Sequence, residues 1–215
     1  MILDYIVMGF ILGGYLYYIL IVLGNRNKIS EESSFNIIKD LIHNYNSINV
    51  ILNEGIFTIY NIKRRVIKLS NKCYYGKSLS DVGISLMEAG ISVIDNNKNR
   101  EINFFRRFFS NLKWLYVIPL VVIFIISEIN TTEDGVILGF LIFISIYFMY
   151  MFINIKNKAY NWIVMNIDRI KQINKKDQMK VINFINKMML CDKFIFWGEL
   201  VGFLKVVMIL LNLKI

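Results

Sequence analysis

Long apolar runs alternate with polar, basic stretches along the chain, and they predict four membrane-spanning helices: residues 2–23, 114–127, 136–155 and 194–213. The first run contains one charged residue, Asp4, and it accommodates the roughly 20 residues that cross a bilayer. It lacks the basic start and cleavage site of a signal peptide, so we expect an uncleaved anchor. The fourth run contains Glu199 and Lys205, and charges within a span usually face protein or water.

Between the first two apolar runs the periodicity becomes that of a small folded domain. Residues 30–45 begin with a helix-start signal, with Ser30 or Ser33 as the cap. Apolar and aromatic residues then recur at helical spacing: Phe35, Ile38, Ile42 and Tyr45. Two β-rich runs follow, "INVILNEGIFTIY" and "RRVIKLS". With a turn at Glu54-Gly55 they predict a small hairpin or strand pair.

A second helix is predicted around "ISLMEAGISVID", residues 84–95, with Ser78 or Ser80 as its cap. Its apolar stripe consists of Val82, Leu86, Met87, Ile91 and Ile94. Core packing by Met87 and Ile91 explains this stripe without any catalytic role.

The stretch "REINFFRRFFSNLK", residues 100–113, predicts a basic amphipathic helix in the headgroup layer of a membrane. Its proposed lipid-facing residues are Phe104, Phe105, Arg106, Arg107, Phe108 and Phe109. The alternative is a core helix of the folded domain.

Composition agrees with a membrane protein, because 56% of residues are hydrophobic, 19% are charged and the mean hydropathy is +0.49. The expected fold is mainly α and membrane-embedded, with a small α+β domain at 24–113. A membrane hairpin at 114–155, a basic helical segment at 156–193 and a last span at 194–213 complete the expected organisation.

Charge predicts the orientation of the spans. Residues 24–113 contain 14 Lys and Arg against 8 Asp and Glu, and residues 156–193 contain 9 against 3, a net charge of +6 in each case. The connector at 127–135 has three acidic residues and no basic one. Basic loops stay cytoplasmic, so both large loops are expected inside and the N-terminus outside. The net charge of +9 then fits topology and anionic lipid, and we expect no nucleic-acid partner.

Residues capable of catalysis or metal binding are scarce. The single histidine, His43, lies far from any acidic cluster, and Cys73 and Cys191 are separated by most of the chain. One histidine and two distant cysteines cannot supply the usual three or four zinc ligands. Both cysteines are expected to be free thiols, and we expect no cofactor.

Residues 58–95, read together, resemble the bacterial neutral zinc metallopeptidase family of integral membrane proteins, the YugP type. The family pattern is D-H-Y-D-P-x-x-K-x-V-x-L-S-x-x-V-Y-x-G-x-S followed by V-A-V-A-A-H-E-x-G-H-A-I-Q. Aligned without a gap, this chain keeps Tyr60, Leu69, Ser70, Tyr74, Gly76, Ser78, Val82, Glu88 and Gly90. The order of anchor, small domain, membrane hairpin, basic segment and last span also resembles the family. The resemblance implies a zincin-type peptidase domain.

The same alignment implies that the zinc site has been lost. Met87 and Ile91 stand at the two histidines of the family's H-E-x-x-H motif, and Glu88 stands at its glutamate. Phe152 stands at the family's third ligand in our alignment of residues 151–159. Thioether sulfur is a soft ligand, and isoleucine is no ligand at all.

The resemblance therefore predicts a bacterial cell-membrane pseudopeptidase that is not an enzyme. We expect it to act by binding, as a partner or regulatory subunit of an active paralogue or of another membrane protein. Two alternatives remain: a small membrane protein of transport or immunity type, suggested by Glu199 and Lys205, and an active peptidase with a rearranged site that uses Glu88.

Overall fold

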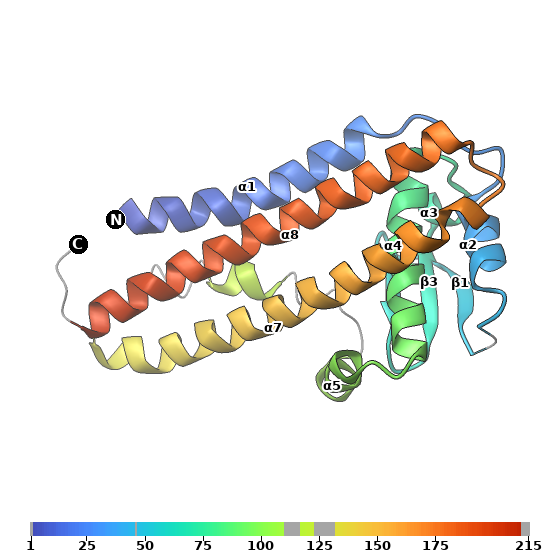
Figure 1. Cartoon of the computed structure of the whole chain (residues 1–215). Coiled ribbons are helices and arrows are strands. Elements are labelled where there is room, and N and C mark those ends of the chain that lie inside the picture. The colour runs from blue at the N-terminus through green and yellow to red at the C-terminus, as the bar shows by residue number, and fades with distance from the viewer. Residues whose placement is uncertain (1, 46, 110–116, 123–131, 212–215) are drawn as a thin grey trace. The chain divides into compact units, whose positions relative to one another are not determined.

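A computed structural model describes residues 2–45, 47–109, 117–122 and 132–211 (Figure 1). It is mainly helical, with one three-stranded sheet. The chain divides into two compact units. The first comprises Met1–Ile19, Trp114–Ile153 and Leu190–Ile215, and the second comprises Leu20–Lys113 and Asn154–Met189. Three long helices contribute to both: α1 (Ile2–Gly24), α7 (Thr132–Asn166) and α8 (Lys175–Leu210).

The second unit contains the sheet, whose strands are β1 (Asn49–Asn53), β2 (Ile59–Asn61) and β3 (Val66–Ser70). The strand order is β1-β3-β2, with β1 parallel and β2 antiparallel to β3. The hairpin expected around Glu54-Gly55 is therefore wrong, whereas the alternative, a strand pair formed by the two β-rich runs, is confirmed because β1 and β2 both pair with β3. The strands on either side of that turn are separated by β3, and the antiparallel pair is closed instead by residues 62–65. Arg65 adopts a left-handed conformation there, with φ 53°.

The same unit contains the shorter helices α2 (Ser34–Ile42), α3 (Asn71–Tyr75), α4 (Leu79–Asn96) and α5 (Arg100–Phe108), of which α3 and α4 pack against the sheet. Of the cap residues that the sequence left open, Ser33 caps α2 and Ser78 caps α4. Ser78 and Asp81 form a reciprocal capping box, which satisfies two backbone N–H groups at the start of the helix.

Helix α4 is the central element of the second unit, and it packs against β2, β3 and α2 (Figure 1). Its expected stripe is largely confirmed, since Val82 and Leu86 are fully buried. Two glycines seven residues apart allow close approach of other helices. A Cβ atom on Gly83 would lie 2.4 Å from the Phe184 ring of α8, and one on Gly90 would lie 3.0 Å from the Ala159 carbonyl oxygen of α7.

Replacing Gly83 with alanine is expected to destabilise the second unit by about 1–3 kcal/mol, the usual cost of overpacking a core. The Phe184 ring is 2% exposed, so it has little room to move away. Thermal unfolding followed by tryptophan fluorescence measures the effect. Gly24→Ala is the control, because a Cβ atom there meets nothing within 4 Å. Equal stability of the two variants would contradict this packing.

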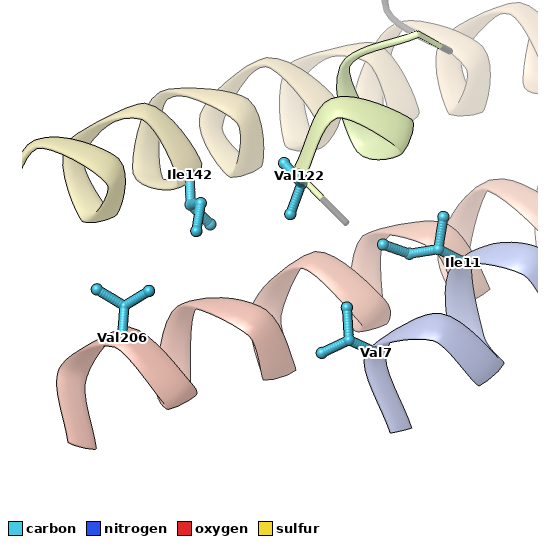
Figure 2. Packing of buried hydrophobic residues seen from close by; sticks show 5 residues of the cluster. All are labelled: Val7, Ile11, Val122, Ile142 and Val206. Atoms are coloured by element: carbon cyan, nitrogen blue, oxygen red, sulfur yellow. The ribbon is translucent and has the colours of Figure 1, made fainter. Parts of the chain in front are cut away.

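In the first unit, α1, α7 and α8 pack through apolar and small side chains. Figure 2 shows five buried residues that point toward one another: Val7, Ile11, Val122, Ile142 and Val206. Glycines fit against larger residues here as well, with a Cβ atom on Gly198 reaching within 2.5 Å of Ile11. Small residues at helix contacts are typical of helices that associate in membranes.

Two helical segments among the described residues are long and apolar enough to cross a membrane, Ile2–Gly24 and Gly139–Arg169. They contain the spans expected at 2–23 and 136–155, apart from the first three residues of the latter. The span expected at 114–127 lies mostly outside the described residues. The span expected at 194–213 lies mainly in α8, which is not one of the two segments. The segment at 156–193 is largely helical, as expected, and includes the short 3-10 helix η2 (Ile167–Arg169).

Candidate functional site on helix α4

The positions aligned with zinc-ligating histidines lie in the core of the second unit. Met87 is 2% exposed and Ile91 is 1% exposed, one turn apart on α4. Phe152, aligned with the third ligand, is 1% exposed and belongs to the first unit. Each of these side chains is an apolar core residue of its own unit.

Glu88 is half-buried between its two apolar neighbours and is bonded to the edge of the sheet. Its Oε2 accepts a hydrogen bond from the backbone N–H of Tyr60, 2.6 Å away on β2. Burial raises the pKa of the Glu88 carboxyl to about 7, although the Tyr60 hydrogen bond and the ammonium of Lys156 act in the opposite direction. Lys156 is itself 4% exposed. Glu88 thus joins a helix to a strand and titrates near neutral pH.

Two turns further along α4, Asp95 forms a second link to the same strand. Its carboxylate is 1% exposed and accepts hydrogen bonds from the Tyr60 hydroxyl and the Arg106 guanidinium. Burial and the Asp95 carboxylate raise the pKa of the Tyr60 hydroxyl well above its usual value. Glu88 and Asp95 are seven residues apart, so they lie on one face of α4. The backbone N–H of Tyr60 bonds to Glu88, and the side-chain hydroxyl of Tyr60 bonds to Asp95.

Helix α5 places its expected lipid-facing residues on different sides. Phe105 is fully buried and Arg106 is bonded to Asp95, whereas Arg107 is exposed and Phe108 is 62% exposed. Phe104 and Phe109 are half-buried. The core-helix alternative therefore accounts for Phe105 and Arg106, and residues 110–113 lie outside the described residues.

An ion pair also connects α5 to α7. Glu101 accepts hydrogen bonds from the Lys158 ammonium at 2.7 Å and from the Asn154 amide at 2.8 Å. Lys156 and Lys158, which counted as topology signals in the sequence, thus also interact with acidic residues of the folded domain.

The remaining residues with catalytic potential do not belong to α4: one is an exposed histidine and two are buried cysteines. His43 is exposed, with its Nδ1 2.7 Å from the Asp40 carbonyl oxygen. Cys73 and Cys191 are buried thiols that are not joined in a disulfide, and burial raises the pKa of the Cys73 thiol. In the described part of the chain, no group of three or more His, Cys, Asp or Glu residues could hold a metal ion.

The sequence pointed to Met87, Glu88 and Ile91 but not to Asp95 or the link through Tyr60, and it indicated Lys156 only as a basic residue beside a span. The spacing of seven between Glu88 and Asp95 was the available signal. Comparisons of the chain with family models, curated proteins and solved structures find no match. What α4 does must therefore be inferred from its own residues and their contacts.

Replacing Glu88 with glutamine is expected to remove a pH dependence of stability. The native pKa, about 7, lies above the usual value of 4.5 for a glutamate carboxyl, so the folded state holds the proton more tightly than the unfolded state. Stability should therefore fall as pH rises from about 4.5 to 7, by up to about 3 kcal/mol for this group. Glutamine stays neutral and its carbonyl can still accept from Tyr60.

The measurement is thermal unfolding of both proteins between pH 4.5 and 8.5. The variant should match the wild type at the acidic end and exceed its stability at the alkaline end. Glu54→Gln, at an exposed position, should leave the wild-type profile unchanged. Parallel profiles of wild type and Glu88→Gln would contradict the burial of this carboxyl.

Proposed function

We propose that the protein is a catalytically inactive relative of the YugP-type membrane metallopeptidases that acts by binding another membrane protein. One observation carries the proposal: the positions of the two motif histidines hold Met87 and Ile91, both at most 2% exposed in the core. A metal bound between α4 and its surroundings would need ligands where these side chains pack. The catalytic glutamate's counterpart, Glu88, bonds to a strand backbone.

The residues that carry the resemblance have structural roles, which supports a retained scaffold. Ser70 and Ser78 cap α3 and α4, and the Gly76 carbonyl accepts from the Ser34 N–H at 2.8 Å and hydroxyl at 2.9 Å. Gly90 permits contact with Ala159. A pseudopeptidase is expected to keep these structural residues after it has lost its metal ligands.

The proposed location is the bacterial cell membrane, with several spans, the N-terminus outside and the large loops in the cytoplasm. Charge supports it. The second unit contains 22 Lys and Arg against 10 Asp and Glu, a net charge of +12, whereas the first unit has a net charge of −3. A basic domain attached to apolar helices fits the anionic inner leaflet, so membrane lipid is the second proposed partner.

The experiment that tests binding is cross-linking in native membranes followed by purification of the full chain. A defined partner should be recovered, and an active metallopeptidase paralogue is the expected one. Recovery of the chain only as a monomer would contradict the binding role. An active peptidase with a rearranged site would instead be revealed by peptide hydrolysis that Glu88→Gln abolishes.

A further inference from the structure

The first unit contains a buried carboxyl group that the proposed function does not use. Glu199 of α8 is 0% exposed. The hydroxyl of Ser145, on α7, donates a hydrogen bond to its Oε1 at 2.7 Å. Its Oε2 is buried and has no hydrogen-bond partner among the residues that the structure describes. A carboxylate needs several donors to remain ionised in such a place, because an isolated buried charge costs far more than a neutral polar group.

Among the described residues, the charged and titratable groups around Glu199 do not provide that compensation. Tyr15 of α1 lies in its electrostatic neighbourhood and is not a cation. From α7 the contact is the neutral hydroxyl of Ser145. The basic residue further along α8, Lys205, bonds to Asp4 of α1 at 2.6 Å. Its charge is therefore already matched by a carboxylate.

We propose that Glu199 and Ser145 form a proton-binding site inside the helical unit, occupied at neutral pH. The proton resides on the Glu199 carboxyl, with Ser145 as its hydrogen-bond partner across the α7–α8 contact. Ionisation of Glu199 would place a negative charge in the buried interior of the unit, with the neutral Ser145 hydroxyl as its hydrogen-bond donor. Proton release is therefore coupled to a change in the packing of α7 against α8. Buried intramembrane carboxyls of this kind mark proton-dependent sites in membrane proteins.

The test is infrared difference spectroscopy of the full chain in lipid vesicles at pH 7, comparing wild type with Glu199→Gln. The proposal predicts a carbonyl band of a protonated carboxyl in the wild type that the variant lacks. Carboxylate bands lost in the variant, with no protonated band, would show that Glu199 is ionised and would overturn the proposal.

A second variant keeps the test decisive if Glu199→Gln does not fold. Ser145→Ala removes the hydrogen bond but not the carboxyl, so it should shift the protonated band to higher frequency without removing it. An unshifted protonated band would overturn the role of Ser145. Carrying out both comparisons in a Glu88→Gln background removes the contribution of Glu88, a carboxyl that titrates near neutral pH.

Discussion

Replacing Asp95 with alanine is expected to lower the free energy of unfolding by about 3 kcal/mol, the lower end of the cost of removing one partner of a buried ion pair, because the Arg106 side chain is 28% exposed. The Asp95 carboxylate is 1% exposed and bonds to both Arg106 and the Tyr60 hydroxyl. Alanine would leave the guanidinium without its carboxylate and the hydroxyl without its acceptor. Within the described ranges of the chain, the Arg106 Nε is already buried without a hydrogen-bond partner.

Chemical denaturation of the purified protein measures this change, with Glu31→Ala as the matched control. Glu31 also pairs with a basic residue, Lys28, but its side chain is 88% exposed, so its removal should have little effect. Combining Asp95→Ala with Arg106→Leu should restore part of the lost stability, because the uncompensated charge is removed as well. A loss below about 1 kcal/mol for Asp95→Ala would contradict the buried link.

Placing histidines at both family ligand positions, Met87→His with Ile91→His, is expected to destabilise the protein rather than create a zinc enzyme. Each imidazole would enter a site that is at most 2% exposed. A buried polar group without a partner costs about 1–3 kcal/mol, so the two together should cost about 2–6 kcal/mol. Zinc should not recover this loss, because the third aligned position holds Phe152.

The measurement is thermal unfolding of the double variant with and without zinc. The control, Met87→Leu with Ile91→Val, keeps both sites apolar and should cost no more than about 3 kcal/mol in total. Wild-type stability of the histidine variant in the absence of zinc would show that these positions are not packed. A large stabilisation by equimolar zinc would show that a ligand set has survived.

Local features of the fold were predictable because short-range chemistry determines them. Ser33 and Ser78 precede apolar periodic runs, and both cap helices. The strand pairing was not predictable from neighbouring residues. The run that ends at Asn53 pairs with a strand that begins at Val66, while the intervening strand takes the other side. Such non-local pairing is determined by how the hydrophobic faces of the whole domain pack. Residues that favour a local turn do not predict it.

The candidate site was predictable only along one helix. The apolar character of Met87 and Ile91 already excluded them as zinc ligands, and their burial agrees with core packing. Arg106 was expected at a lipid surface because its neighbours are phenylalanines and another arginine. It instead bonds to Asp95 on a different helix. A basic residue in an amphipathic helix can serve either environment, and only the tertiary structure distinguishes them.

We propose that α4 is the packed, metal-free counterpart of a zinc helix. The test is metal analysis of the full chain purified from native membranes, combined with a peptide-hydrolysis assay. We expect zinc well below one equivalent per chain and no hydrolysis above that of the Glu88→Gln variant. One equivalent of zinc, together with hydrolysis that Glu88→Gln abolishes, would contradict it.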